Sequence, residues 1–304
     1  MNIKNNVIEL IGNTPILKLN KIKEKYNLKS NLFLKMECFN PGFSIKDRVA
    51  LNMIQDVLNK KIITENGTII EATSGNTGIG LSLICNYLNL KLIIVMPENM
   101  SEERKKIFNI LGSKVILTSK EGGMNESIKM AEKIQKITKD SIYLSQFDNY
   151  SNVVAHYKTG EEIINDMDGN IDYFICGVGT GGTLTGIGKI LKEKINDVSI
   201  IAVEPENSAV LSGKKGGIHK IQGIGAGFVP TILDTKIYDD IVTINCEDAI
   251  KMVKVISKLE GIMVGISTAA NICACIKYDS LIRKDNKNIL TIAHDLLERY
   301  LSAY

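Results

Sequence analysis

A lysine at the start of a predicted helix has the clearest capacity for covalent chemistry. Lys46 lies in the segment 40–48, where Ser44 followed three residues later by Asp47 resembles a capping box. Lys46 would then occupy the first turn of the following helix, where the helix dipole disfavours a cation and should lower the pKa of the lysine. Most lysines are solvated surface groups, but an amine with a lowered pKa can form a Schiff base and then act as a base.

Two glycine-rich turns follow predicted strands and could bind anions. The turn Thr73–Gly78 precedes a helix, so that it is either a capped helix start or a place where hydroxyls and N–H groups converge on a carboxylate. The glycines of the turn Gly177–Thr183 match the dinucleotide-binding pattern, and Glu204 lies at a suitable distance beyond them. Its additional glycine and its two threonine hydroxyls fit a single phosphate monoester equally well, so this turn alone leaves both ligands open.

The elements that would position these turns alternate between strands and helices. Apolar runs predict strands at Thr68–Ala72, Lys91–Met96, Lys114–Thr118, Ile171–Cys176, Ser199–Glu204, Ile241–Ile244 and Asn288–Ala293. Helical spacing is found around Ala50–Leu58 and at Ile79–Asn86, Glu102–Leu111, Asn125–Thr138, Leu184–Ile195 and Ala249–Leu259. This order predicts an α/β protein with parallel sheets covered by helices on both faces, in which ligands bind where strands end. The segment Ser212–Gly227 lacks periodicity and is predicted to be a functional loop.

Composition and charge exclude several classes of protein. The chain has 304 residues, 44% of them hydrophobic, which suffices for two domains. Its formal net charge of +3 is spread among interspersed acids and bases, so we expect no nucleic-acid partner. No apolar run approaches the roughly 20 residues that span a bilayer, and residues 1–10 lack a signal core, so we expect a cytoplasmic protein. The six cysteines lack zinc-like spacing, which predicts buried thiols and no metal site.

Together the motifs resemble the fold-type II pyridoxal-phosphate enzymes, and within them the cysteine synthase and cystathionine β-synthase group. The resemblance runs nearly end to end through eight ordered segments, and their order is far more specific than any one of them. The segments are Ile11–Pro15, the Lys46 segment, Thr73–Gly78, Met96–Glu98, Gln146–Asn149, Gly179–Thr183, Gly223–Pro230 and Gly265–Ser267. The resemblance implies a tryptophan synthase β-like fold with two domains, each containing a mostly parallel sheet flanked by helices.

The resemblance also implies roles for individual residues. Lys46 would bind the aldehyde of pyridoxal 5′-phosphate, Asn76 would support its 3′-oxygen and Ser267 would meet its pyridine nitrogen. The phosphate would be cradled mostly by backbone N–H groups of Gly179, Thr180, Gly181, Gly182 and Thr183. The substrate would be bound by Thr73, Ser74, Thr77 and Gln146, with Met124 at the mouth of the pocket and Gly225 nearby.

A serine beside the pyridine nitrogen has a consequence for the expected reaction. Unlike a carboxylate, a hydroxyl cannot keep the ring protonated, so the resemblance implies loss of a good β-leaving group. Lys46 would remove the Cα proton, an aminoacrylate would form, and a nucleophile would add at Cβ. The leading interpretation is a cysteine synthase, which converts O-acetyl-L-serine and sulfide to L-cysteine and acetate. One alternative consumes L-cysteine, releases hydrogen sulfide and makes lanthionine or cystathionine. A nicotinamide-dependent oxidoreductase would rest on Gly177–Gly182 alone.

The resemblance further implies domain boundaries and partners. Residues 41–147 would form a smaller movable domain that carries the substrate-carboxylate loop and closes over the site. Residues 1–40 and 148–304 would form the larger cofactor-binding domain. We expect a homodimer without a membrane partner. The C-terminal tail of a serine acetyltransferase is a candidate partner, and a purely regulatory role through it is a further alternative.

Four segments depart from the pattern of the family. Phe43 replaces a glycine, the segment His156–Gly160 is one residue short, and Asp295–Leu297 replaces Asp-Ser-Gly. Glu126 replaces a glycine near the pocket mouth. Its carboxylate would be either a solvated acid stabilised by the helix dipole or a partner for the ammonium group of a second amino acid. These departures leave the donor and the acceptor open.

Overall fold

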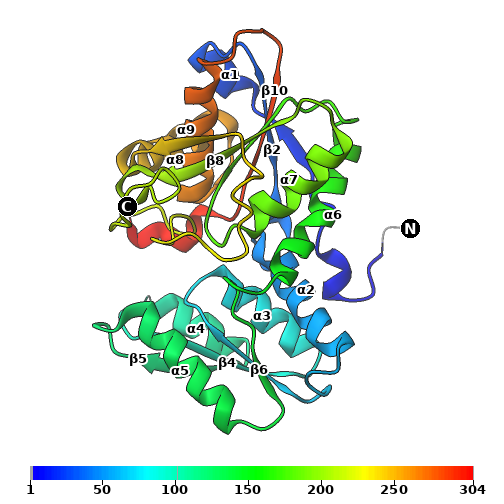
Figure 1. Ribbon diagram of the computed structural model, residues 1–304, viewed down its shortest axis with the longest axis vertical. Helices are drawn as coiled ribbons and strands as arrows, with labels where there is room; N and C mark the ends of the chain where they lie inside the picture. The colour runs from blue at the N-terminus through cyan, green and yellow to red at the C-terminus, as the bar shows by residue number, and fades with distance from the viewer. Residues whose placement is uncertain (1–2, 101, 304) are drawn as a thin grey trace. The chain divides into compact units, whose positions relative to one another are not determined.

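The computed structural model describes residues 3–100 and 102–303, which divide into two compact units (Figure 1). Unit 1 contains the described part of Met1–Ile11 and Asn40–Ala155, and unit 2 contains Gly12–Phe39 and the described part of His156–Tyr304. The sequence predicted boundaries after residues 40 and 147 and placed the N-terminal segment with the larger domain. The difference has a packing reason, because Ile11 and Ala155 both join the hydrophobic core of unit 1.

Unit 1 is built around a four-stranded parallel sheet with the strand order β5-β4-β3-β6. Its strands are β3 (Thr68–Ala72), β4 (Lys91–Pro97), β5 (Lys114–Thr118) and β6 (Ser141–Tyr143). Its helices are η1 (Val7–Leu10), α2 (Lys46–Asn59), α3 (Asn76–Tyr87), α4 (Glu102–Ile110) and α5 (Gly123–Ile137). The helix α6 (Ser151–Asp166) crosses the boundary between the units.

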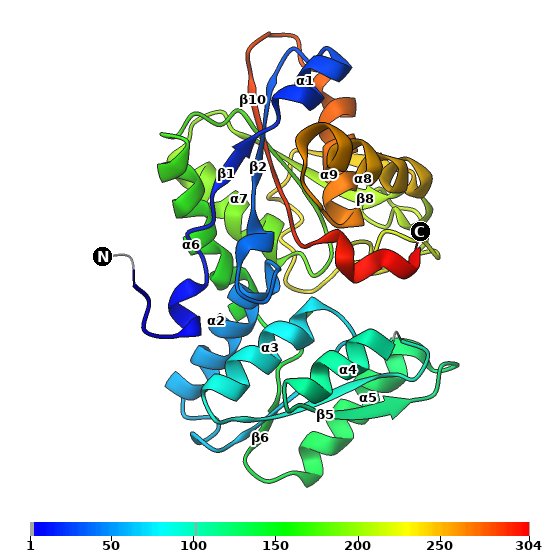
Figure 2. The same cartoon turned by 180° about the vertical axis from the view of Figure 1, so that it is seen from behind.

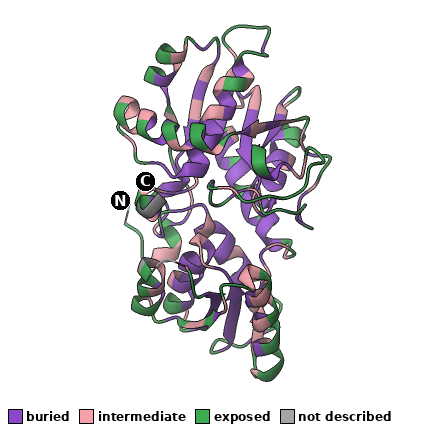
Figure 3. Ribbon diagram, turned by 90° about the vertical axis from the view of Figure 1, so that its left-hand side faces the viewer, coloured by how far each residue is buried: buried purple, intermediate pink, exposed green. Residues whose placement is uncertain are grey.

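Both faces of this sheet are apolar, because successive side chains of a strand point to opposite faces. Ile69 of β3 packs in the cluster that contains residues of α2 and α3, whereas its neighbour Ile70 packs against α5. In β4 the same alternation assigns Ile94 to the first cluster and Val95 to the second. Figure 3 shows buried residues concentrated on strands and on the inner faces of helices. The sheet is therefore covered on both faces, as parallel sheets require.

Unit 2 contains a six-stranded sheet with the order β1-β2-β10-β7-β8-β9, in which β1 and β2 pair antiparallel and the other pairs are parallel. Its strands are β1 (Ile16–Lys18), β2 (Asn31–Lys35), β7 (Tyr173–Gly177), β8 (Ser199–Pro205), β9 (Asp240–Ile244) and β10 (Asn288–Ile292). Its helices are α1 (Asn20–Tyr26), η2 (Glu37–Phe39), α7 (Gly182–Lys194), η3 (Glu206–Ser208), α8 (Cys246–Glu260), α9 (Ile266–Asp279) and η4 (Leu297–Ala303). Helices α8 and α9 lie on one side of the sheet and α6 and α7 on the other (Figures 1 and 2).

All seven predicted strands are confirmed to within two residues at either end, whereas β1, β2 and β6 were missed. Strands β1 and β6 have only three residues, and the apolar run of β2 is only three residues long, between Asn31 and Lys35. The predicted loop Ser212–Gly227 indeed contains neither helix nor strand. Among the described residues, no helix combines the length and the hydropathy needed to cross a membrane.

That lysine, Lys35, is buried completely and ties the N-terminal segment of unit 2 to α6. Its Nζ lies 3.2 Å from the carboxylate of Glu162 and 2.8 Å from that of Asp166, and it donates to the carbonyl oxygen of Thr14 at 2.5 Å. The hydroxyl of Thr14 donates to Glu37 at 2.6 Å. The motif Ile11–Pro15 therefore has a structural role in this chain, because Thr14 is held from both sides.

Candidate active site

Helix α2 begins at Lys46, as the sequence predicted. The backbone N–H of Lys46 donates to the hydroxyl of Ser44 at 3.2 Å. The carboxylate of Asp47 accepts from the N–H of Gly42, five residues earlier in the chain, at 2.5 Å. A side chain at Gly42 would overlap this carboxylate. The short segment before the helix is therefore fixed tightly around the start of α2.

Phe43 stands in this turn where the family has glycine. Its φ of +58° is in the left-handed region, which costs a non-glycine residue about 1–2 kcal/mol. The turn forms nevertheless, since the N–H of Phe43 donates to the carbonyl oxygen of Asn40 at 2.7 Å. Phe43 therefore strains this turn, but the turn still closes through its backbone hydrogen bond.

The loop Thr73–Gly78 leads from β3 into α3, which begins at Asn76. The N–H of Gly75 donates to the hydroxyl of Thr73 at 3.2 Å, and the guanidinium of Arg104 donates to the carbonyl oxygen of Ser74. One turn further into α3, a Cβ at Gly80 would lie only 3.0 Å from the carbonyl oxygen of Lys46. The first turns of α2 and α3 therefore lie together, and the positive helix ends favour an anion there.

Gln146 belongs to the same part of unit 1. The hydroxyl of Thr77 donates to its Oε1 at 2.7 Å, and the amide of Asn152 donates to its carbonyl oxygen at 2.9 Å. With Oε1 accepting from Thr77, the Gln146 side chain presents its NH₂ group as the donor for a ligand. The structure thus brings together the four residues that the resemblance assigned to the substrate carboxylate.

Met124 and Glu126 lie in the first turns of α5. Met124 is partly buried and packs against the cluster around Ile70 and Val95. The carboxylate of Glu126 accepts a hydrogen bond from the hydroxyl of Ser119 at 2.5 Å. This contact agrees with an acid stabilised at a helix N-terminus, and a second role in choosing the acceptor stays a prediction.

Sequence reasoning missed Glu71, a buried acid that contacts the backbone of the Gln146 loop. It lies in β3 with 1% of its surface exposed, and burial raises its pKa from 4.5 to about 8. Backbone N–H groups of Gln146, Ser145 and Ala72 oppose this shift by binding its carboxylate. Burial, followed by the charge of Glu71, also raises the pKa of the nearby Tyr143. The carboxyl group is therefore predominantly protonated in the folded protein at neutral pH.

This shift predicts a pH-dependent stability that Glu71→Gln should remove. Between pH 4.5 and about 8 the folded state binds one proton more than the unfolded state, so this group lowers stability as the pH rises. The neutral variant should therefore gain stability relative to wild type by about 1.4 kcal/mol per pH unit across that window. Urea unfolding at pH 5 and pH 8 measures the difference, with the exposed Glu65→Gln as the control. An equal gain at both pH values would contradict the shift.

In unit 2, the loop Gly177–Thr183 connects β7 to α7 and is built for close approach of its backbone to a ligand. Gly181 has a φ of +86°, and α7 starts at Gly182, so that the unsatisfied N–H groups of a first helical turn follow directly. A side chain at Gly179 would overlap the carbonyl oxygen of Gly223. These features fit a phosphate monoester at a helix N-terminus.

The contacts of Glu204 distinguish between the two ligands that the sequence allowed for this loop, a dinucleotide and a phosphate monoester. A dinucleotide-binding protein uses such an acid for the ribose hydroxyls. Here its carboxylate accepts from the N–H groups of Leu211 and Ser212 at 2.8 and 3.0 Å, and from the hydroxyl of Ser212 at 2.6 Å. Glu204 therefore anchors the beginning of the long loop, which argues against the nicotinamide interpretation.

His156 is a second residue that sequence reasoning missed. Its Nε2 lies 3.2 Å from the hydroxyl of Thr183, and its Nδ1 lies 3.3 Å from that of Thr159. The hydroxyl of Thr180 accepts from the N–H of Gly182 at 3.4 Å. The two threonine hydroxyls of the phosphate loop are thus held in place by the protein. The only signal in the sequence was the shortened segment His156–Gly160.

Ser267 lies in the first turn of α9 and is buried. A Cβ at Gly223 would lie 3.8 Å from its hydroxyl, and Asn271 of the same helix accepts from the N–H of Gly177 at 2.8 Å. The N–H of Gly225 donates to the carbonyl oxygen of Val178 at 2.8 Å. Within unit 2 the structure therefore gathers Ser267, the phosphate loop and the predicted loop around Gly225.

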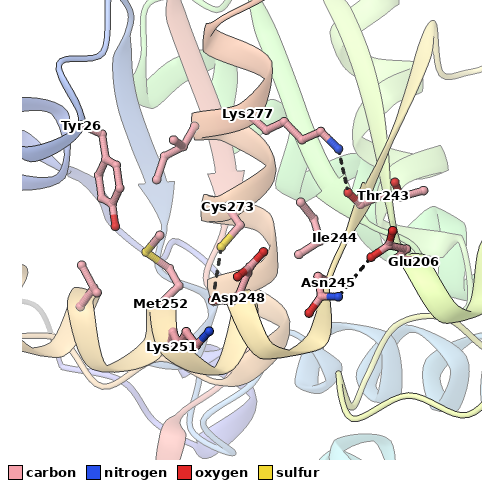
Figure 4. A pocket seen from close by; sticks show the side chains of 12 residues that line it. Tyr26, Glu206, Thr243, Ile244, Asn245, Asp248, Lys251, Met252, Cys273 and Lys277 are labelled. Carbon is pink, nitrogen blue, oxygen red and sulfur yellow. Dashed lines mark hydrogen bonds between the residues drawn. The ribbon is translucent and has the colours of Figure 1, made fainter.

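A separate pocket of about 510 Å³ opens between α1, α8 and α9 in unit 2 (Figure 4). It contains none of the predicted site residues. Its thiol, Cys273, donates to the carbonyl oxygen of Asp248, and burial followed by the charge of Asp248 raises the pKa of this thiol to about 12. Two of its polar side chains are also engaged, since Lys277 donates to Thr243 and Asn245 to Glu206. A protonated thiol is a poor nucleophile, so this pocket lacks the chemistry of an active site.

The fold and the loops define a two-unit α/β enzyme of fold type II, with a lysine at a helix start in one unit and a glycine-rich loop before a helix in the other. Residues 7–295 match the family of pyridoxal-phosphate dependent enzymes, and the chain belongs to that family. The predicted resemblance, fold class and cofactor are thereby confirmed.

Individual relatives narrow the comparison within the family. The chain is 48% identical to cysteine synthase B of Campylobacter jejuni over 305 residues, covering 99% of this chain and 98% of the relative. The crystal structure of a cysteine synthase from Entamoeba histolytica matches with a TM-score of 0.96 at 40% identity, covering 99% of this chain and 90% of that one. A hydrogen sulfide-producing enzyme from Fusobacterium nucleatum matches with a TM-score of 0.93 at 42% identity, covering 98% of this chain and 100% of that one.

Proposed function

We propose that this protein is a cysteine synthase that forms L-cysteine and acetate from O-acetyl-L-serine and sulfide. The observation that carries the proposal is the cluster at the start of α2 and α3, where Lys46 adjoins the anion-binding loop Thr73–Thr77. The identity to cysteine synthases over nearly the full length supports the same reaction.

The cofactor would be held by the residues that the family resemblance assigns to it. Lys46 and Asn76 would bind the aldehyde and the 3′-oxygen, and Ser267 would donate to the pyridine nitrogen. Backbone N–H groups of Gly179–Thr183 would bind the phosphate at the start of α7. When bound, pyridoxal 5′-phosphate supplies an electron-withdrawing ring that acidifies the Cα proton of the amino acid.

The residues of unit 1 would position the substrate and move its proton. Thr73, Ser74, Thr77 and the NH₂ group of Gln146 would bind the carboxylate, fixing the Cα–H bond in front of Lys46. The amine of Lys46 would take the Cα proton, the acetate would leave from Cβ, and Lys46 would return the proton after sulfide has added. Carboxylate binding would draw in the mobile domain, predicted as residues 41–147, and thereby exclude water.

We extend the proposal to a cytoplasmic homodimer, on the strength of the family resemblance. Sedimentation should then give about twice the 33.5 kDa mass of the chain. The C-terminal tail of a serine acetyltransferase would compete with O-acetylserine for the carboxylate loop.

Product analysis tests the reaction. Purified enzyme is supplied either with O-acetylserine and sulfide or with L-cysteine alone, and the amino acids, acetate and sulfide are quantified. We expect L-cysteine and acetate in equal amounts in the first case and little sulfide in the second. Faster sulfide release from cysteine, with lanthionine as the product, would favour the alternative function.

The same assay resolves the role of Glu126. If its carboxylate only stabilises α5, the ratio of amino-acid thiol to sulfide as acceptor should be equal in wild type and in Glu126→Gly. A several-fold fall in this ratio would show that Glu126 selects an amino-acid acceptor, as a partly exposed ion pair worth about 1 kcal/mol allows.

A further inference from the structure

His294 connects Ser267 to the end of strand β7. It follows β10 directly, and its backbone N–H donates to the hydroxyl of Thr268 at 3.0 Å. Its ring lies between two polar side chains, with Nδ1 3.4 Å from the hydroxyl of Ser267 and Nε2 3.6 Å from the thiol of Cys176. All of these residues belong to unit 2. The ring therefore bridges α9 and β7 next to the predicted pyridine ligand.

The segment that carries His294 is fixed to the start of α9 by independent contacts. The carbonyl oxygen of Asp295 accepts from the N–H of Gly265 at 3.0 Å, and its carboxylate accepts from the hydroxyl of Tyr300. Leu296 forms a β-bridge with Val264. This part of the chain includes Asp295–Leu297, which departs from the family pattern. The backbone that carries the imidazole is thus fixed to the start of α9.

The direction of the hydrogen bonds matters because a serine hydroxyl carries a single proton. If Ser267 donated that proton to Nδ1, it could not also donate to a ring nitrogen. If Nδ1 carries a proton, His294 becomes the donor, and the Ser267 proton is available for a ligand. The thiol of Cys176 faces both Nε2 of His294 and the carbonyl oxygen of Gly177, each at 3.6 Å. Donation from this thiol to Nε2 places the proton of a neutral imidazole on Nδ1.

We propose that His294 is a positioning residue, which donates from Nδ1–H to the Ser267 hydroxyl and thereby directs the Ser267 proton to the pyridine nitrogen of the cofactor. The proposal rests on the proposed function, because that function assigns Ser267 to this nitrogen. It adds a residue that acts through Ser267 and touches neither the cofactor nor the substrate.

The test compares two amide variants of His294 in the holoenzyme. Asparagine can place an N–H group near the position of Nδ1, whereas glutamine reaches the position of Nε2. His294→Gln should weaken cofactor binding about five-fold, the effect of one lost hydrogen bond, and His294→Asn should stay within about two-fold of wild type. Equilibrium dialysis against pyridoxal 5′-phosphate measures both. With nitrogen-15 cofactor, the pyridine signal of His294→Gln should shift towards that of Ser267→Ala.

The double variant with Ser267→Ala separates positioning from a structural role. Once the serine hydroxyl is gone, His294→Gln should cause no further loss of cofactor affinity. Independent, multiplicative losses would overturn the proposal, as would a His294→Gln enzyme that binds the cofactor and gives the same pyridine signal as wild type. A wild-type protein that binds no pyridoxal 5′-phosphate would instead refute the proposed function.

Discussion

Replacing Lys46 with alanine should lower the β-replacement activity by about 10³-fold or more, because one amine serves as the covalent anchor and as the acid–base catalyst. Lys46 is the first residue of α2, and its carbonyl oxygen lies close to Gly80 of α3, the helix that follows the carboxylate loop. After treatment of the wild-type protein with borohydride, the cofactor should be attached permanently to the peptide that contains Lys46. The variant should bind the cofactor without forming this link.

Lys60→Ala is the matched control for this experiment. Lys60 follows the other end of α2, is exposed, and pairs with Asp56 in the preceding turn at 2.8 Å. Its replacement should leave activity and cofactor attachment unchanged. Attachment of the cofactor to a different peptide, or a Lys46→Ala enzyme with more than a tenth of the wild-type rate, would contradict the assignment.

Replacing Lys35 with alanine should destabilise the protein by about 3–5 kcal/mol, the usual cost of removing one member of a buried ion pair. The variant removes the buried Lys35 ammonium group from beside the carboxylate of Glu162, whose side chain is 9% exposed. It also removes the donor to the carbonyl oxygen of Thr14. Equilibrium unfolding in urea measures the loss. Lys60→Ala should change stability by only about 0–0.5 kcal/mol, because its ion pair is exposed.

A second variant distinguishes lost charge pairing from lost packing at this site. Lys35→Met retains the apolar stem, and addition of Glu162→Gln removes the buried charge, so this pair of substitutions should recover part of the stability. If Lys35→Ala costs less than about 1 kcal/mol, the buried ion pair contributes little to stability. If the double variant is no more stable than Lys35→Met alone, the uncompensated charge of Glu162 is not the cause of the lost stability.

Local patterns in the sequence determined the frame of the site. The apolar runs of β3 and β5 predicted those strands to the residue, and the segment around Ser44 placed Lys46 in the first turn of its helix. These features depend on backbone preferences and on contacts within a few residues, which a sequence displays directly. The ordered motifs added the family and its cofactor.

Only the tertiary structure decided which polar groups are buried and with which partners. Lysine is usually an exposed residue type, but Lys35 is fully buried and contacts Thr14, Glu162 and Asp166, which are distant from it in the sequence. Likewise, the position of Glu204 in the sequence fitted a nucleotide-binding pattern. In the structure its carboxylate instead accepts hydrogen bonds from the backbone of the following loop.

The same limit explains why sequence reasoning missed the roles of Glu71, His156 and His294. The pKa of Glu71 is raised by desolvation between neighbouring elements, and His294 meets Ser267 and Cys176 from three separate elements. Desolvation and hydrogen-bond direction depend on the complete surroundings of a group. Those surroundings exist only after residues distant in the sequence have packed together.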